Sequence, residues 1–437
     1  MIENNQSQQK AWVISVNMGY GHQRTAYPLR HLAPNGKVIN ANDYAGIPKN
    51  DRRIWETSRK FYEFISDFKR IPLIGEAIFG FFNRFQKIWS FYPKRDLSKP
   101  SFQLRQICSL IKKGWGKHLI ESLKNNPLPI ISTFFTPAFM AEFWGYPNDI
   151  YCVVCDADIA RTWAPFNPKE SKIKYFTPNR RTANRLRLYG VKKENIFVTG
   201  YPLPIENIGP NREIIKNDLA NRLINLDPKK EYRQQYDVLI KKYLGKIPEN
   251  SNHPLTIMFS IGGAGAQKEM GVVILKSLLN NIKNREIKTI FSAGIKEKVK
   301  KHFLYWIKHF GLENYLGQNI EILWAPEINE YFDKFNQALR VTDVLWTKPS
   351  ELVFYSALGI PIILAPTIGS QEDFNRDWLL QKGAAICQEN PHYTNEWFFD
   401  YWRVGAFAEA AMQGFVEIEK MGVYNIENII NQKSLGA

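Results

Sequence analysis

The sequence is poor in the features that mark secreted or membrane-spanning proteins. Its four cysteines, Cys108, Cys152, Cys155 and Cys387, are too few and too scattered for the disulfide framework of a secreted domain. No uninterrupted apolar run approaches the ~18 residues of a spanning helix, and the first ten residues have no apolar core that would predict a signal peptide. We therefore expect a cytoplasmic protein that is soluble or bound peripherally to a membrane.

The charge of the chain is unbalanced toward basic residues. Lys and Arg (58) exceed Asp and Glu (42), which gives a formal net charge of +16. This excess favours an anionic partner, such as a nucleic acid, a membrane surface or a phosphorylated ligand. At 437 residues the chain is also too long for one ordinary core, and it fits two domains of roughly 200 residues each.

Short apolar runs alternate with helical stretches in both halves of the chain. The runs in the first half are "AWVISVN", "KVINAND", "LPIISTFF", "DIYCVVCD", "KIKYFTP" and "NIFVTGYP". Those in the second half are "LTIMFSIGG", "KTIFSAG", "NIEILWAP", "VLWTK" and "IPIILAP". This alternation predicts α/β domains with parallel sheets, which bind ligands at the carboxyl ends of their strands.

The expected organisation is two Rossmann-like domains. We predict a first domain over 1–204, a charged linker or insertion over 205–253, a second domain over 254–395, and C-terminal helices over 396–437. The C-terminal helices have helical spacing and no strand, so they could cross back to the first domain.

A segment over 55–100 interrupts the first domain with aromatic and basic residues. Apolar residues recur in it at spacings of three and four, as on one stripe of a helix: Ile74, Ile78, Phe81, Phe85, Ile88 and Tyr92. Basic residues flank this stripe. The segment could lie in an anionic membrane interface, or the stripe could pack onto the sheet as ordinary core.

Two short patterns near position 155 suggest metal or redox chemistry but have simpler interpretations. Cys152 and Cys155 are spaced like a redox or metal pair, yet they lie in an apolar run that is typical of a buried strand. Asp156 and Asp158 have the outline of a metal-binding Asp-x-Asp motif, but two carboxylates fall far short of a full set of oxygen ligands. We expect no metal here.

The first strand ends in a glycine-rich turn, Gly19-Tyr20-Gly21-His22. Such a turn before a helix can hold a phosphate, or it can leave room for an acceptor molecule beside a catalytic base. The third glycine of a dinucleotide-binding loop is missing, because position 24 is Arg.

A second glycine-rich turn, "TIMFSIGGAGAQKE", carries Gly262, Gly263 and Gly265 between a strand and a helix. Its backbone N–H groups and the helix dipole could hold a phosphate. The turn is neither a Walker loop nor a G-x-G-x-x-G fingerprint, and its glycines would equally suit a tight turn.

Polar residues follow the last two predicted strands, in "TKPSELVFYSALGIPIILAPTIGSQEDFN". Ser350 is a candidate N-cap of a helix. Glu351 in its first turn either compensates the helix dipole or accepts hydrogen bonds from ribose hydroxyls. A further glycine turn leads into a helix with polar residues within its first turns: Gly369, Ser370, Gln371, Glu372 and Asn375.

These motifs resemble those of the inverting GT-B glycosyltransferases that include monogalactosyldiacylglycerol synthase and the lipid II-forming N-acetylglucosaminyltransferase. The resemblance implies two domains facing a cleft, with a UDP-sugar site in the C-terminal domain. By the same resemblance, the glycine turn lies near the diphosphate and Glu351 binds ribose. Gln371, Glu372 and Asn375 would contact the sugar or its phosphates. Counted back from Gly359, the family's Glu falls at Phe354, so the turn here is about two residues shorter.

The first half extends the resemblance. The segment with Gly19, Gly21 and His22 is similar to the family's acceptor-side Gly-x-Gly-His, and Asp156 and Trp163 follow the family's pattern of Asp and then Trp. The family usually carries His between these two residues. This chain has Ala160-Arg161 there, and the departure concerns acceptor recognition.

An inverting sugar transfer needs a base for the acceptor hydroxyl and positive charge or N–H dipoles for the departing diphosphate. His22 at the end of the first strand is the candidate base, and Asp156 is its rival. Lys348 and the amides of the 262–265 turn could neutralise the leaving group, so neither a metal nor a cofactor is demanded.

The leading hypothesis is therefore a glycosyltransferase that moves a hexose or N-acetylhexosamine from a UDP-sugar to a lipid or other amphiphilic acceptor. Its expected partners are the nucleotide-sugar donor, the acceptor and an anionic membrane surface on the cytoplasmic side, and not nucleic acid. The alternatives are a nucleotide-sugar 2-epimerase and a non-catalytic protein that binds nucleotide sugars.

Overall fold

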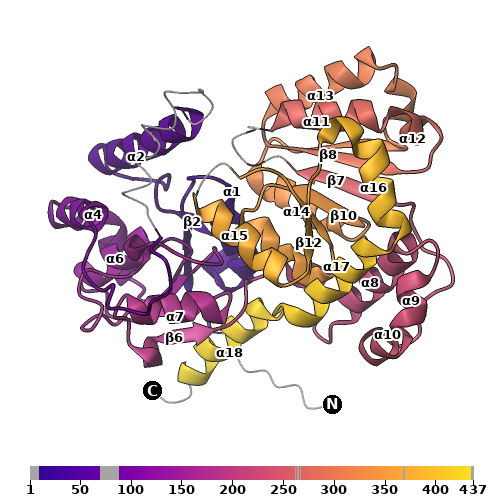
Figure 1. Cartoon of the computed structure of the whole chain (residues 1–437). Coiled ribbons are helices and arrows are strands. Elements are labelled where there is room, and N and C mark those ends of the chain that lie inside the picture. The colour runs from indigo at the N-terminus through magenta and orange to yellow at the C-terminus, as the bar shows by residue number, and fades with distance from the viewer. Residues whose placement is uncertain are drawn as a thin grey trace. The chain divides into compact units, whose positions relative to one another are not determined.

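The computed structural model describes residues 9–68, 88–260, 262, 265, 267–367 and 370–434. The chain divides into two compact units (Figure 1). The first unit comprises Met1–Pro202, Ile368–Phe374 and Met421–Ala437. The second comprises Leu203–Thr367 and Asn375–Lys420.

The first unit is built on a six-stranded sheet in the order β2-β1-β3-β4-β5-β6, in which every neighbouring pair is parallel. Its strands are β1 (Trp12–Ser15), β2 (Ile39–Asn40), β3 (Ile130–Ser132), β4 (Ile150–Val153), β5 (Lys174–Thr177) and β6 (Ile196–Val198). The central strands β3 and β4 are buried along their whole length, as a parallel sheet covered on both faces requires.

Helices and short 3₁₀ turns connect these strands. The α-helices of the first unit are α1 (Tyr20–Ala26), α2 (Lys49–Phe68), α4 (Phe102–Lys112), α5 (Lys117–Lys124), α6 (Phe135–Phe143), α7 (Arg180–Leu188) and α18 (Gly422–Ser434). The 3₁₀ helices are η1 (Tyr27–Leu32), η2 (Pro34–Gly36), η3 (Arg161–Trp163) and η4 (Lys193–Asn195).

The second unit repeats this plan with a six-stranded sheet in the order β12-β11-β10-β7-β8-β9, again parallel throughout. Its strands are β7 (Thr256–Ser260), β8 (Lys288–Gly294), β9 (Ile320–Trp324), β10 (Val344–Thr347), β11 (Ile362–Leu364) and β12 (Ala385–Cys387).

The helices of the second unit include those of the charged stretch that precedes β7. The α-helices are α8 (Glu213–Leu226), α9 (Glu231–Gln235), α10 (Asp237–Leu244), α11 (Lys268–Ser277), α12 (Leu279–Lys283), α13 (Glu297–His309), α14 (Ile328–Leu339), α16 (Thr394–Arg403) and α17 (Ala406–Glu417). The 3₁₀ helices are η5 (Ile205–Asn207), η6 (Glu313–Tyr315), η7 (Glu351–Leu358) and η8 (Pro391–Tyr393). Helix α15 (Ser370–Gln381) begins among residues of the first unit and ends among those of the second.

The predicted fold class is confirmed: the chain is α/β, with two Rossmann-like parallel sheets. Every strand expected from the sequence is present, and β12 is an additional short strand at the sheet edge. The predicted facing of the two domains across a cleft stays a prediction.

The predicted return of the C-terminal helices to the first domain is also confirmed, for α18. The amide of Asn425 donates to the carbonyl of Thr199 at 2.8 Å. Gly422 lies so close to the backbone of Tyr201 that a Cβ there would overlap its carbonyl oxygen. Glycine is therefore required for the helix to pack at this point.

The apolar stripe predicted within 55–100 is only partly described. Ile88 and Tyr92 do not lie on a helix; Ile88 is buried, whereas Tyr92 is 66% exposed. They therefore do not share one helical face, contrary to the prediction. The other members, Ile74, Ile78, Phe81 and Phe85, lie outside the described residues.

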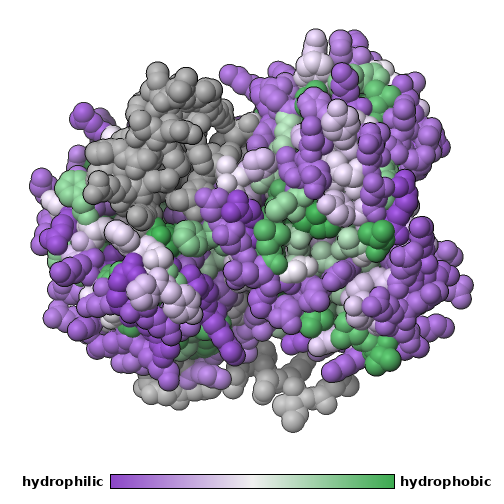
Figure 2. Space-filling model, in the orientation of Figure 1, coloured by the Kyte–Doolittle hydropathy of each residue, from purple (hydrophilic) through white to green (hydrophobic). Residues whose placement is uncertain are grey.

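The visible surface is mainly hydrophilic (Figure 2). Of the helices in the described part of the chain, none combines the length and the apolar character needed to cross a membrane.

A buried arginine fastens helix α8 to the ends of α14 and η7 in the second unit. The guanidinium of Arg222 donates to the carbonyl oxygens of Thr342 (2.7 Å), Leu358 and Gly359 (both 3.1 Å) and Leu339 (3.2 Å). Burial lowers the pKa of this side chain, and nearby carboxylates act in the opposite direction. The charged stretch is thus anchored by a side chain that satisfies several carbonyls at once.

Replacing Arg222 should destabilise the second unit markedly. We expect Arg222→Met to lower its free energy of unfolding by about 3 kcal/mol, because buried carbonyls lose their only common donor. Urea denaturation followed by tryptophan fluorescence measures the change. Arg403→Met on the surface of α16 is the matched control and should change it by about 0.5 kcal/mol or less. Equal effects of the two substitutions would contradict the anchoring role.

Candidate functional site

In the second sheet the strand order reverses between β7 and β10. The chain proceeds from β7 to β8 and β9 on one side, and then returns to β10 on the other side of β7. At such a point the connections leave in opposite directions and open a crevice at the carboxyl ends of the strands, where open α/β sheets bind ligands. The 262–265 turn follows β7 and the 348–351 turn follows β10. Two predicted donor segments therefore come together at this switch point.

The turn after β7 is closed by a hydrogen bond from the N–H of Gly265 to the carbonyl of Gly262, at 2.8 Å. Gly265 has φ +71°, a conformation that favours glycine. The side chain of Lys348 lies across Gly262, because a Cβ there would stand 2.5 Å from Lys348 Cε. Glycine at 262 thus leaves room for the lysine. Gly263 lies outside the described residues.

The turn after β10 is tight and places Glu351 at the start of a helix. The N–H of Ser350 donates to the carbonyl of Lys348 at 2.8 Å, and η7 begins at Glu351. Glu351 is largely buried at this end of the strand. Ser350 occupies the expected N-cap position, but its side chain makes no capping hydrogen bond. Whether Glu351 binds ribose stays a prediction.

Helix α15 carries the remaining predicted donor residues. Gln371 and Glu372 are half-buried in its first turn. Asn375, one turn later, is 1% exposed, and its amide donates to the carbonyl of Pro349 at 3.2 Å. Asn375 therefore braces the turn that holds Lys348 and Glu351. Gly369 and the side chain of Ser370 lie outside the described residues.

The first sheet has its own switch point, between β1 and β3. The turn with Gly19 follows β1 and leads directly into α1, which begins at Tyr20 and holds Gly21 and His22 in its first turn. Gly19 has φ +113°, and an added Cβ would meet no atom within 4 Å. Backbone conformation, rather than lack of space, therefore requires glycine at this position.

Backbone contacts orient the imidazole of His22. Its Nδ1 lies 2.9 Å from the carbonyl oxygen of Thr133, immediately after β3. A carbonyl only accepts, so Nδ1 carries the hydrogen and the lone pair of the neutral ring is on Nε2. The hydroxyl of Thr133 donates in turn to the carbonyl of His22 at 2.9 Å. The ring of Phe134 packs beside the imidazole, with centroids 4.7 Å apart.

The rival base, Asp156, and His22 both lie close to the thiol of Cys155. Cys155 Sγ is 3.4 Å from His22 Nδ1 and 4.0 Å from Asp156 Oδ2. Cys155 is buried and Asp156 is half-buried. The two candidate bases thus belong to one cluster. Cys155 was not among the predicted site residues; its position beside Asp156 at the end of a strand was the signal that could have identified it.

Trp163 lies in an aromatic cluster next to His22. Its ring centroid is 6.2 Å from that of His22, 6.0 Å from Phe134 and 5.3 Å from Phe135. Because Trp163 is buried, it supports the position of the imidazole through packing. A direct contact of Trp163 with an acceptor stays a prediction.

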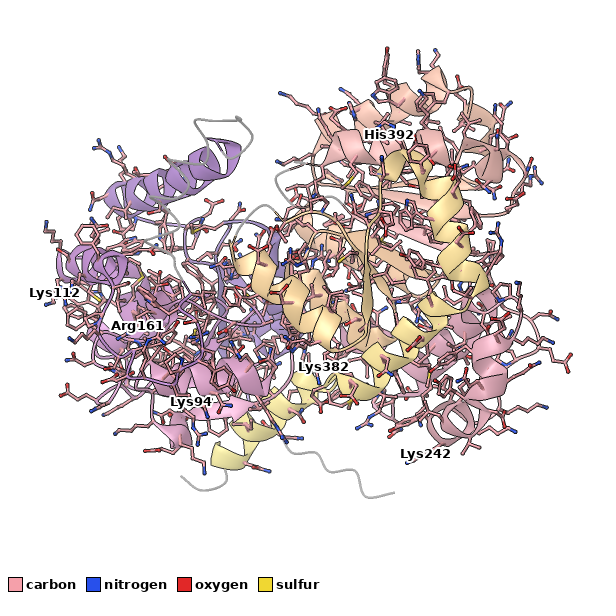
Figure 3. All side chains as sticks on the ribbon, in the orientation of Figure 1. Lys94, Lys112, Arg161, Lys242, Lys382 and His392 are labelled. Carbon is pink, nitrogen blue, oxygen red and sulfur yellow. The ribbon has the colours of Figure 1, made fainter. Side chains whose placement is uncertain are left out.

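Arg161, which lies between Asp156 and Trp163 in the sequence, is surrounded by side chains of the first unit (Figure 3). Its guanidinium donates to the carbonyls of Ser98 (2.6 and 3.0 Å), Ala164 (2.7 Å) and Pro165 (3.0 Å). Burial lowers the pKa of Arg161 to about 10. This arginine therefore holds the loop around Trp163 in place.

Asp158, the second carboxylate of the Asp-x-Asp pattern, is an internal counter-ion. Its oxygens accept from Arg185 Nε and Nη2, both at 2.8 Å, and from Arg181 Nε at 3.1 Å. Arg185 is 0% exposed, so its charge depends on this carboxylate. Within the described part of the chain, no three His, Cys, Asp or Glu side chains are grouped to hold a metal ion.

Residues 247–425 match a family described as a domain of unknown function (DUF6938). No curated protein matches the chain. Solved structures with a similar fold include MurG from Acinetobacter baumannii, with 15% identity, a TM-score of 0.43, and coverage of 78% of this chain and 82% of that one.

Two further structures are similar at comparable levels. A UDP-GlcNAc 2-epimerase from Neisseria meningitidis bound to UDP-GlcNAc has 13% identity and a TM-score of 0.44, and covers 78% of this chain and 84% of its own. HepE from Anabaena in complex with UDP has 13% identity and a TM-score of 0.40, with coverage of 78% and 85%.

Of the two carboxylates in the Asp-x-Asp pattern, we expect Asp158 to be required for stability. We expect Asp158→Asn to lower the free energy of unfolding by about 3 kcal/mol, because it leaves the buried Arg185 without a counter-charge. Thermal denaturation measures this. Asp43→Asn, which removes an exposed carboxylate of the same unit, is the control and should change stability by less than about 1 kcal/mol. A stable Asp158→Asn protein would mean that Arg185 is neutralised elsewhere.

Proposed function

We propose that the protein is a glycosyltransferase that moves a sugar from a nucleotide-sugar donor to an acceptor hydroxyl with inversion. The observation that carries this proposal is the orientation of His22. The carbonyl of Thr133 holds Nδ1–H and leaves the lone pair on Nε2, as a general base requires. The imidazole stands at one switch point, and a glycine turn covered by a lysine stands at the other.

The acceptor side of the reaction follows from this cluster. The acceptor hydroxyl attacks the anomeric carbon and gives its proton to Nε2 of His22, while the bond from that carbon to the diphosphate oxygen breaks. The imidazolium that forms is stabilised by the carbonyl of Thr133 and by the nearby carboxylate of Asp156. In this scheme His22 is the base, and the negative charge of Asp156 stabilises the positive charge that His22 acquires.

The donor side is assigned to the second switch point. Lys348 lies across Gly262 in the turn after β7, so its ammonium is suited to the departing diphosphate. Glu351 is proposed to bind the ribose hydroxyls, and Gln371 and Glu372 the sugar. The charge of the lysine stabilises the leaving group in this scheme, and UDP is the proposed nucleotide.

We further propose a lipid or amphiphilic acceptor, presented at an anionic membrane surface on the cytoplasmic side. The support is the net charge of +16 together with large exposed aromatic side chains in the first unit. Trp89 is 48% exposed, with Arg95 6.0 Å from its ring centroid, and Tyr92 and Phe102 are also exposed. Aromatic side chains beside basic ones are typical of surfaces that enter the membrane interface.

The deciding experiment is incubation of the purified protein with radiolabelled nucleotide sugars and a membrane lipid extract. Label that enters the lipid phase supports transfer. Epimerised sugar nucleotide in the aqueous phase supports a 2-epimerase instead. Saturable binding without turnover supports a non-catalytic role. The last two outcomes would each reject the proposal.

Replacing the proposed base should separate chemistry from donor binding. We expect His22→Ala to lower turnover about a hundredfold or more, because proton transfer in the transition state is lost. The affinity for the nucleotide should stay unchanged. Turnover comes from the radiolabel assay and affinity from calorimetry. His309→Ala on the surface of α13 is the matched control. Full activity of the His22 variant would remove it as the base.

Replacing Lys348 should instead weaken the binding of the nucleotide. We expect Lys348→Met to weaken binding of the nucleoside diphosphate about tenfold to a hundredfold, because a charged hydrogen-bond donor to phosphate is lost. Lys334→Met, which removes an exposed lysine of the same unit, should leave the affinity unchanged. Titration calorimetry with UDP compares the two. An unaltered affinity of the Lys348 variant would place the phosphates elsewhere.

A further inference from the structure

A groove of about 520 Å³ lies beside α16, near the edge of the second sheet where β12 is the outermost strand. Its lining residues come from the segment after β12 and from η8 and α16: Glu389, Asn390, Tyr393, Glu396, Trp397, Asp400 and Tyr401. Three of these are aromatic and three are acidic, and none is basic. In a chain with a net charge of +16, this composition is a local reversal of the overall charge.

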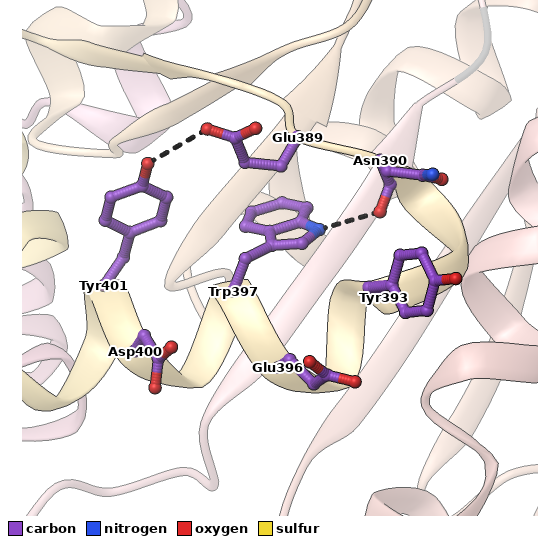
Figure 4. Close-up of a pocket in the computed structure, with 7 residues that line it drawn as sticks. All are labelled: Glu389, Asn390, Tyr393, Glu396, Trp397, Asp400 and Tyr401. Atoms are coloured by element: carbon purple, nitrogen blue, oxygen red, sulfur yellow. Dashed lines mark hydrogen bonds between the residues drawn. The ribbon is translucent and has the colours of Figure 1, made fainter.

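The aromatic residues form a row along the groove. Trp397 and Tyr401 lie about one turn apart on α16, and Tyr393 is the N-cap residue of that helix. Figure 4 shows Trp397 between the two tyrosines, with Glu389 on one side of the row and Glu396 and Asp400 on the other. The rings thus line a strip that carboxylates border on both sides.

Hydrogen bonds and packing hold this arrangement. The indole N–H of Trp397 donates to the carbonyl of Asn390 at 3.0 Å, and Trp346 of β10 packs edge-on against the same indole at 5.3 Å between centroids. The hydroxyl of Tyr401 donates to Glu389 Oε1 at 3.2 Å. Burial and this hydrogen bond raise the pKa of Tyr401, so its hydroxyl stays protonated. The groove is therefore preorganised before any ligand binds.

The carboxylates are available to a cation but do not converge on one point. Asp400 pairs with Arg403 at 2.7 Å. Glu389 and Glu396 are exposed and form no ion pair with any described residue. No three acidic side chains in the described part of the chain are close enough to hold one metal ion. The negative charge is thus distributed along the aromatic row, which suits an extended cation better than a compact one.

We propose that this groove binds a linear organic cation with two or more protonated amines. The methylene segments would lie on the faces of Tyr393 and Trp397, where the adjoining ammonium groups gain from the ring quadrupoles. The ammonium groups would pair with Glu389 and Glu396 on the two sides of the row. A polyamine and a peptide with several lysine side chains share this chemistry. None of the residues that line the groove is assigned to the proposed nucleotide-sugar site.

Titration calorimetry of the whole protein with spermidine tests the proposal. We expect saturable one-site binding that weakens as the salt concentration rises, because the pairing is electrostatic and exposed. The double variant Glu389→Gln with Glu396→Gln should bind about tenfold more weakly, and Tyr393→Leu about threefold more weakly. The general positive charge of the protein repels spermidine from other surfaces, which favours a clean readout.

The control removes the same number of charges elsewhere on the second unit. Glu249→Gln with Glu313→Gln should leave spermidine binding unchanged. No binding, or binding that the groove variants do not weaken more than this control, overturns the proposal. Binding of maltotriose that depends on Tyr393, without binding of spermidine, would also overturn it and make the groove a carbohydrate site. A short lysine peptide that competes with spermidine would identify side-chain amines as the second source of the ligand.

Discussion

The reversal of strand order in each parallel sheet is the constraint on which the rest of the structure depends. Crossover connections that leave a strand pair in opposite directions cannot cover the carboxyl ends of both strands, so a crevice stays open there. In the first sheet this point is between β1 and β3, and in the second it is between β7 and β10. The histidine and the glycine turn occupy these points, and the remaining side chains of each cluster hold them.

Small backbone details give these two points their chemistry. The carbonyl of Thr133 selects the tautomer of His22, because it can accept only from a protonated Nδ1. In the second unit, the missing side chain of Gly262 allows Lys348 to lie across the turn. Asn375 supports the same turn from α15. In each case a structural contact determines where a functional atom lies.

Much of the fold could be predicted because strands buried on both faces read as apolar runs between helical stretches. Strand β12 escaped prediction because it has three residues and is incompletely buried. The predicted stripe through Ile88 and Tyr92 was wrong because spacing alone cannot show that these two residues lie outside a helix. Cys155 also escaped, because its contact with His22 joins positions 133 residues apart in the chain.

By itself, the sequence determined the two α/β units, the glycine turns at strand ends, and the residue types able to hold a phosphate or take a proton. These properties depend on local pattern and on the chemistry of single side chains. Only the tertiary structure decided that Arg161 and Asp158 serve the packing, and that His22 shares a cluster with Asp156. The reason is physical: hydrogen bonds and ion pairs between distant segments depend on how strands are ordered in the sheet, and spacing along the chain does not encode that order.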